Sequence, residues 1–175
     1  MANSELLVDG SNVLWAWPRT RHLLLNKDHG AAQRLLVSTA TQSALRTSYQ
    51  QLTFVFDGPP PATGPSSSAG VRVLYPDLGQ SADERIVELV AQAVHGGIST
   101  MVATSDRGLR DLVRRKGGTT MGGQALLQKM DPRGSLDVPR GDGGEEGKDP
   151  EKPRPSSRDT ESWLARFSSK KRPPK

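Results

Sequence analysis

The sequence predicts an α/β fold with a central, mostly parallel sheet of about five strands, and three features indicate it. Short apolar runs recur along residues 1–130, each run ends in a polar turn, and stretches with helical periodicity separate the runs. Strands that alternate with helices are typical of a parallel sheet covered by helices on both faces. We therefore expect a three-layer sandwich over residues 1–130, followed by a disordered C-terminal tail.

The first predicted strand is the apolar run at residues 6–8, which ends abruptly at Asp9. A short run of this kind is typical of a buried parallel strand. Such a strand delivers the residue at its carboxyl end to the crevice where open α/β sheets bind ligands. Asp9 is therefore the first candidate site residue. Asn12 is either a support for a metal-bound water or a phosphate oxygen, or a cap of the following segment.

Two further predicted strands end in the same way. The run at residues 52–56 ends at Asp57, and the run at 99–104 ends at Ser105 and Asp106. Because the carboxyl ends of parallel strands meet at one edge of the sheet, we expect these side chains to converge with Asp9.

The segments that connect the first three strands carry equally clear patterns. Residues 30–48 have apolar positions at helical spacing and predict one crossover helix. Residues 58–70 are mostly Gly, Pro and Ser, which predicts a mobile loop at the mouth of the site. A third short strand is expected at 71–75.

The next helix has a recognisable beginning. Ser81 is followed three residues later by Glu84, which is the pattern of a capping box, and an apolar stripe then extends to residue 94. Asp83 falls in the first turn of this helix, close to the expected strand ends. We interpret Asp83 as a site ligand, and the alternative is that it only complements the helix dipole.

The last predicted elements complete the sheet. A basic helix follows Asp106, residues 119–121 form a minimal edge strand, and residues 125–130 form a short helix. Arg107 and Arg110 on the basic helix suit a phosphate track, although such charges usually form a solvated helix face.

A second group of candidate RNA-binding residues lies after the first strand. Trp15, Arg19 and Arg21 are suited to a lip that stacks bases and contacts phosphates. Trp17 belongs to the same stretch. The alternative is that one or both tryptophan rings pack beneath the next helix.

Composition limits the function classes. The net charge of +5 and the isoelectric point near 9.8 are compatible with a polyanionic partner. The chain has no cysteine, which excludes disulfides, thiolate metal sites and cysteine catalysis. It shows no basic-then-apolar leader and no long apolar run, so we expect a soluble, cytoplasmic protein that does not contact a membrane.

The C-terminal part differs in composition from the rest. Residues 131–158 contain few aliphatic side chains among Gly, Pro and mixed charges, and predict a disordered linker. Residues 159–167 predict a short amphipathic helix that displays Trp163 and Phe167, and residues 168–175 form a basic tail. The short helix is expected to dock either on its own domain or on a partner.

The candidate carboxylates predict a metal site. Several ionised carboxylates repel one another in one crevice unless cations neutralise them. An all-oxygen ligand set selects Mg²⁺ or Mn²⁺ rather than zinc, and such sites hydrolyse phosphodiesters. The predicted metal ligands are Asp9, Asp57, Asp83 and Asp106, with Asn12 and Ser105 in supporting positions.

These motifs, in their order and spacing, resemble the YacP-like NYN domains, which are relatives of the PIN and flap-endonuclease fold. The resemblance covers about residues 4–130 and is carried by residues 7–12, 55–58, 81–86 and 104–107. It implies a PIN-like sandwich and a metal-dependent endoribonuclease with Asp9, Asp83 and Asp106 as catalytic residues. Some members of the group act on messenger RNA at the ribosome, so we expect RNA as substrate and the ribosome as a possible partner.

Other functions are compatible with parts of the pattern. The main alternatives are a non-catalytic RNA- or ribosome-binding module on the same fold and a structure-specific DNA nuclease. A haloacid dehalogenase-type phosphatase requires a second Asp two residues after the first, where this chain has Ser11. The sequence leaves the oligomeric state open.

Overall fold

The structure is a computed structural model that describes residues 4–132. The predicted helix at 159–167, the basic tail at 168–175 and nearly all of the predicted linker at 131–158 lie outside the described residues.

Five strands form a single sheet in the order β3-β2-β1-β4-β5. Every pairing between neighbouring strands is parallel, which confirms the predicted α/β class and makes the sheet fully parallel. Thr119–Met121 is the predicted edge strand. The strands are β1 Ser4–Asp9, β2 Gln51–Val55, β3 Val71–Leu74, β4 Ser99–Ala103 and β5 Thr119–Met121.

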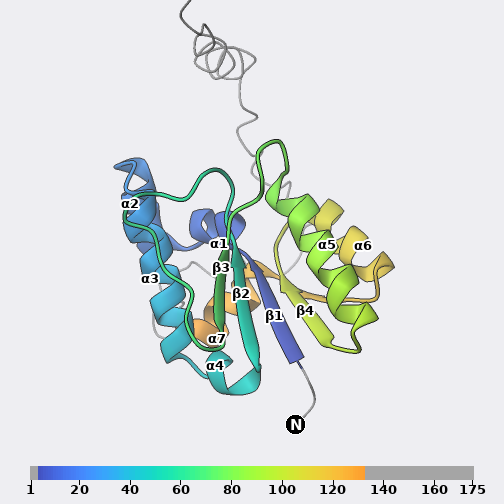
Figure 1. The fold of residues 1–175 in the computed structure, drawn as a ribbon. Coiled ribbons are helices and arrows are strands. Elements are labelled where there is room, and N and C mark those ends of the chain that lie inside the picture. Colours follow the sequence, from blue (N-terminus) through green and yellow to red (C-terminus); the bar gives the residue numbers. More distant parts are fainter. Residues whose placement is uncertain (1–3, 133–175) are drawn as a thin grey trace, which may run out of the picture. The chain divides into compact units, whose positions relative to one another are not determined.

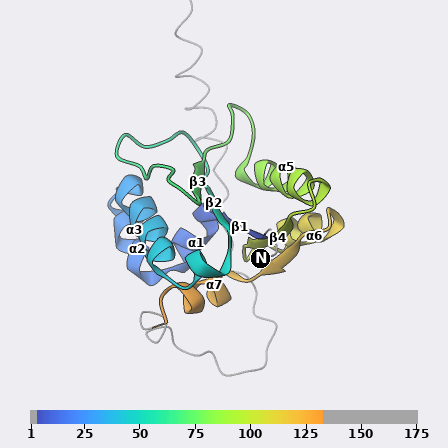
Figure 2. The same cartoon turned by 60° about the horizontal axis from the view of Figure 1, so that its bottom comes forward.

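Helices cover both faces of this sheet and complete the predicted three-layer sandwich (Figure 1). Helices α5 and α6 lie on one face, and the others lie on the opposite face (Figure 2). Among the helices of residues 4–132, none has the length and apolar character needed to cross a membrane. The helices are α1 Gly10–Ala16, α2 Pro18–Leu25, α3 His29–Gln42, α4 Leu45–Ser48, α5 Ala82–His95, α6 Arg107–Arg115 and α7 Gly123–Met130.

Two apolar cores flank the sheet, and the alternation along β1 assigns each residue to one of them. Leu6 and Val8 belong to the core beneath α1, α3 and α7, whereas Leu7 belongs to the core beneath α5 and α6. Because successive strand residues point to opposite faces, Asp9 shares the face of Leu7. The carboxylate that ends β1 is therefore directed to the side of the sheet that carries α5 and α6.

The helical segments after β1 differ from the prediction. Residues 10–25, which show no clear period, form α1 and α2. Asp9 caps the first of these helices, and Pro18 occupies the first turn of the second, where its missing N–H costs nothing. The predicted single helix over 30–48 is divided into α3 and α4, because the backbone of Ser43 is extended.

The Gly/Pro/Ser-rich segment at residues 58–70 is tied to its surroundings. Arg46 donates a hydrogen bond to the carbonyl oxygen of Ala69 at 3.3 Å, and the Val73 amide donates to Ser67 Oγ at 2.9 Å. Gly30 approaches Thr63 so closely that a Cβ atom would lie 2.5 Å from the threonine hydroxyl. These contacts anchor the segment that the sequence predicts as a mobile loop, and a lid movement would have to break them.

Candidate active site

The carboxyl edge of the sheet contains the topological switch point of the fold. The chain proceeds from β1 to β2 and β3 on one side and then crosses to β4 and β5 on the other. Ligands of open α/β sheets bind outside the strand ends at this point. Val8 pairs with Ala103, so Asp9 and Thr104, the next residue on each chain segment, lie beside each other at the switch point.

Asp9 is buried and held through both of its carboxylate oxygens. Its Oδ1 accepts a hydrogen bond from the Asn12 amide at 3.1 Å, and its Oδ2 accepts one from Thr104 Oγ1 at 2.9 Å. Only 3% of the residue is exposed. The first bond makes Asp9 the N-cap of α1 and the second joins the ends of β1 and β4, so this side chain has a fixed orientation.

The hydroxyl of Thr104 also positions Asp106. The Asp106 amide donates to Thr104 Oγ1 at 3.1 Å, and Asp106 Oδ1 accepts from the Leu109 amide at 2.9 Å as the N-cap of α6. The buried hydroxyl of Thr104 therefore bonds to the carboxylate of Asp9 and to the backbone of Asp106, which are two of the predicted catalytic residues. The sequence analysis missed Thr104 as a site residue, because its role depends on the pairing between β1 and β4.

Asn12 and Ser105 hold the turn between β4 and α6. The Ser105 amide donates to Asn12 Oδ1 at 3.0 Å, and the Gly123 amide at the start of α7 donates to Ser105 Oγ at 3.2 Å. A Cβ atom on Gly123 would lie 2.9 Å from Ser105 Oγ, so this close approach requires glycine. The cap of α1 is Asp9 rather than Asn12, which corrects the alternative interpretation of Asn12 as a cap.

Asp57 connects the end of β2 to the start of α5. Its amide donates to Ser11 Oγ at 2.9 Å, and its Oδ1 accepts from the Ala82 amide at 3.2 Å. Asp57 is exposed and lies against the residue that precedes Asp83. The sequence analysis also missed Ser11, whose hydroxyl joins the β1–α1 turn to the end of β2.

The capping box at the start of α5 is confirmed. The Glu84 amide donates to Ser81 Oγ at 3.2 Å, and the Ser81 amide donates to Glu84 Oε2 at 2.9 Å. Glu84 is thus engaged at the helix terminus, while Asp83 is half-buried in the same turn. The capping role predicted for Glu84 is confirmed, and the ligand role of Asp83 stays a prediction.

Within residues 4–132, the helices α1, α5, α6 and α7 each directly follow a strand and so begin at the carboxyl edge of the sheet. The N-terminus of a helix carries a partial positive charge and amide groups that favour anions. Amides in the first turns of α1, α5 and α6 donate to the carboxylates of Asp9, Asp57 and Asp106, respectively. Such termini also suit a phosphate group.

The donor set at this edge has the chemistry of a site for hard cations, since every candidate ligand is an oxygen atom. Within residues 4–132, no group of three or more His, Cys, Asp or Glu side chains is arranged to hold a metal ion. The assignment of Asp9, Asp57, Asp83 and Asp106 as metal ligands therefore stays a prediction. Hydrogen bonds through the Thr104 hydroxyl connect the Asp9 carboxylate to the Asp106 backbone.

The two tryptophans after β1 have different environments. Trp17 is 2% exposed and belongs to the core, whereas Trp15 is 54% exposed. Arg19 forms an ion pair with Asp131 at 2.7 Å and lies over the Trp17 ring at 5.5 Å, and Arg21 is exposed on α2. Only Trp15 of the two rings is accessible for stacking.

The two arginines predicted on α6 follow Asp106 closely. Arg107 is the first residue of the helix and is exposed, and Arg110 is half-buried one turn later. They remain candidates for contacts with a phosphate backbone.

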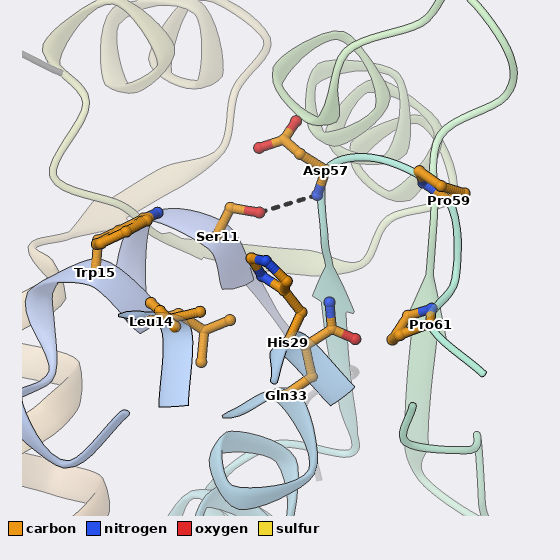
Figure 3. Close-up of a pocket in the computed structure, with 9 residues that line it drawn as sticks. Ser11, Leu14, Trp15, His29, Gln33, Asp57, Pro59 and Pro61 are labelled. Carbon is orange, nitrogen blue, oxygen red and sulfur yellow. Dashed lines mark hydrogen bonds between the residues drawn. The ribbon is translucent and has the colours of Figure 1, made fainter. Parts of the chain in front are cut away.

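A pocket of about 320 Å³ lies next to Asp57 on the α1–α3 side. Figure 3 shows Trp15 on one side, Pro59 and Pro61 on the other, and His29 and Gln33 of α3 between them. The sequence analysis assigned no role to either residue of α3, because their position in the pocket depends on how α3 packs against the β2–β3 segment. The lining consists of Ser11, Leu14, Trp15, Leu24, His29, Gln33, Asp57, Pro59 and Pro61.

The comparison with known families identifies the domain. A profile of the YacP-like NYN domain matches residues 6–136, which include all four candidate carboxylates. The chain belongs to the YacP-like NYN domain family. NYN domains are nucleases and typically depend on metal ions, so the family implies a nucleic-acid substrate.

Solved structures of this family share the fold. A crystal structure of a tryptophan-to-leucine mutant of Rae1 (YacP) from Bacillus subtilis has a TM-score of 0.61 and 26% identity, with 74% of this chain and 76% of that chain covered. A second Rae1 (YacP) crystal structure from Bacillus subtilis has a TM-score of 0.61 and 23% identity, with 95% of this chain and 82% of that chain covered. No curated protein matches the sequence.

Proposed function

We propose that this YacP-like NYN domain is a metal-dependent endoribonuclease that hydrolyses phosphodiester bonds in single-stranded RNA. The observation that carries the proposal is the buried hydroxyl of Thr104 at the switch point of the sheet, which donates to the Asp9 carboxylate and accepts from the Asp106 backbone amide. The family, whose members are nucleases, supports the same chemistry.

The candidate ligands suit Mg²⁺ or Mn²⁺ by their chemistry. Asp9, Asp83 and Asp106, with Asp57 as a fourth, would supply only carboxylate oxygens. An ionised carboxylate has more than one acceptor site on each oxygen, so an oxygen that receives a backbone hydrogen bond is still able to coordinate a cation. When bound, the metal activates a water molecule and stabilises the charge that develops on the phosphate.

The residues around the carboxylates have positioning tasks. Thr104 fixes the orientation of Asp9 and the backbone of Asp106, and Asn12 holds the Ser105 amide. When hydrogen bonds already hold the carboxylates in position, the activation free energy is lower because the charged groups need not reorganise during the reaction. We assign the exposed Arg107, the first residue of α6, to contacts with the RNA backbone.

We further propose messenger RNA, cleaved at the ribosome in the cytoplasm, as the physiological substrate. The support is the resemblance of the sequence to ribosome-acting members of the family. The basic isoelectric point near 9.8 is in keeping with a polyanionic partner.

The test uses one nucleotide sequence in several forms. The full-length protein is incubated with labelled single-stranded RNA, RNA duplex and single-stranded DNA, in Mg²⁺, Mn²⁺ or chelator, with and without ribosomes. We expect internal cleavage of single-stranded RNA only when a metal is present, and no cleavage by Asp106→Asn. Asp111→Asn is the matched control, because Asp111 lies on the same helix and its exposed side chain forms an ion pair with Arg114.

Each alternative predicts a different result. RNA binding without cleavage in either metal indicates the non-catalytic binding module. Preferential cleavage of branched or duplex DNA indicates a structure-specific DNA nuclease, and cleavage that persists in chelator refutes the metal dependence.

A further inference from the structure

The pocket next to Asp57 is built to receive a flat ring. Its volume of about 320 Å³ is at the lower end of the range of small-molecule sites, roughly 300–1,000 Å³. The indole of Trp15 lies on one side of the pocket and Pro59 and Pro61 lie on the other, with His29 between them (Figure 3). Because Trp15 is 54% exposed, its ring is accessible to a ligand.

The pocket also contains a polar group with a fixed orientation. Gln33 is 5% exposed, and its Oε1 accepts a hydrogen bond from the Tyr75 hydroxyl at 2.7 Å. Burial raises the pKa of Tyr75, so the phenol keeps its proton at neutral pH and acts as this donor. Within residues 4–132 the Gln33 amide nitrogen donates no hydrogen bond, and it is thus available to a ligand in the pocket.

The location connects the pocket to the carboxylate edge. Asp57 lines the pocket, and its carboxylate accepts a hydrogen bond from the first amide of α5, next to Asp83. Ser11 also lines the pocket and bonds to the Asp57 amide at 2.9 Å. The pocket and the carboxylate edge thus share Asp57, so one nucleic-acid strand is able to contact both.

We propose that this pocket binds one unpaired nucleobase of the RNA strand that is cleaved. The inference rests on the proposed function for the identity of the strand. The base stacks on Trp15 opposite the two prolines, and the Gln33 amide donates a hydrogen bond to an acceptor on the base edge. Every base has a π-face and an acceptor atom, so the pocket selects an unpaired base rather than one particular base. A paired base would first have to leave its stack, which disfavours duplexes.

Binding to two oligomers of equal charge tests the pocket. The full-length protein, in chelator, is titrated into a labelled short oligouridylate and into an abasic ribose-phosphate oligomer of the same length, and anisotropy gives each Kd. We expect the wild-type protein to bind the oligouridylate at least about tenfold more tightly, the usual size of a stacking contribution. Trp15→Ala and Gln33→Met should reduce this ratio toward one.

The control is Leu25→Ala, which removes a side chain that is 69% exposed and does not line the pocket. This variant should keep the wild-type ratio. Tryptophan fluorescence in a Trp163→Phe background gives a second readout, because Trp15 and Trp17 are then the two remaining tryptophans. Oligouridylate should quench this fluorescence, and adding Trp15→Phe should remove most of the quenching because Trp17 is buried.

Cleavage of the same RNA in Mn²⁺ separates this inference from the proposed function. Equal affinity for the two oligomers refutes base binding in the pocket, even if the RNA is cleaved. An unchanged ratio of the two Kd values in Trp15→Ala refutes it as well. Base-dependent binding that requires Trp15 supports the pocket, and if the RNA is then not cleaved, only the nuclease proposal fails.

Discussion

Replacing Thr104 with valine isolates the hydroxyl on which the candidate site depends. Thr104 is 0% exposed, and its Oγ1 bonds to Asp9 Oδ2 at 2.9 Å and to the Asp106 amide at 3.1 Å. Valine has nearly the same shape, so packing in the core should change little. The substitution leaves a buried carboxylate oxygen and an amide without this partner.

The expected cost follows from these two bonds. A buried donor left unsatisfied costs about 1–3 kcal/mol, and a hydrogen bond to a charged group contributes about 1.5–3 kcal/mol. Because both bonds share one atom, the two costs overlap, and we expect Thr104→Val to lower the free energy of unfolding by about 2–4 kcal/mol. For a domain of this size the melting temperature should fall by roughly 6–14 °C.

The activity should fall as well, because both Asp9 and Asp106 lose an orienting contact. We expect a loss of RNA cleavage by about a hundredfold, comparable to removal of one preorganised hydrogen bond. Thr104→Ser keeps the hydroxyl and removes one methyl group, so it should cost about 1 kcal/mol of stability and retain most of the activity.

Urea unfolding followed by circular dichroism and cleavage of labelled RNA provide both measurements for both variants. Wild-type stability and activity in Thr104→Val would show that the hydroxyl does not position the site. Equal damage in Thr104→Ser would indicate that packing, not hydrogen bonding, explains the loss.

Four further predictions concern neighbouring residues. Asp83→Asn should reduce cleavage by hundreds-fold or more, whereas Glu84→Gln keeps the capping box and should retain activity; equal inactivation of the two variants in cleavage assays would make Glu84 a ligand. Glu84→Ala should lower stability by about 1 kcal/mol in melting curves with activity largely kept. Asp106→Asn should abolish cleavage without a loss of melting temperature, because asparagine also caps helices well; marked destabilisation would contradict this. Gly10→Ala places a Cβ atom 2.3 Å from the Phe56 ring and should cost about 1–3 kcal/mol, and Phe56→Leu in the same chain should recover part of that loss in a double-mutant cycle.

Local sequence patterns were sufficient to predict much of the carboxyl edge of the sheet, where the candidate site lies. The strands predicted to end at residues 8, 56 and 104 end within one residue of these positions, at Asp9, Val55 and Ala103. The capping box of Ser81 and Glu84 is also confirmed. These features depend on neighbouring residues alone: an apolar run that stops, or a serine followed three positions later by an acid. No such pattern predicts the two helices over residues 10–25, which have no clear period. There Asp9 caps α1, Pro18 occupies the first turn of α2, and Trp17 between them is buried.

The sequence by itself determined the α/β class, the parallel sheet and the candidate carboxylates, because burial pattern and capping act within a few residues along the chain. Only the tertiary structure decided that Thr104 joins Asp9 to Asp106, that Asn12 holds Ser105, and that Trp17 is buried while Trp15 is exposed. Asp9 and Thr104 are 95 positions apart in the chain, and Asn12 and Ser105 are 93 positions apart. Such contacts depend on strand order and register, which are set by the packing of the whole sheet and its helices and leave no pattern in any single segment.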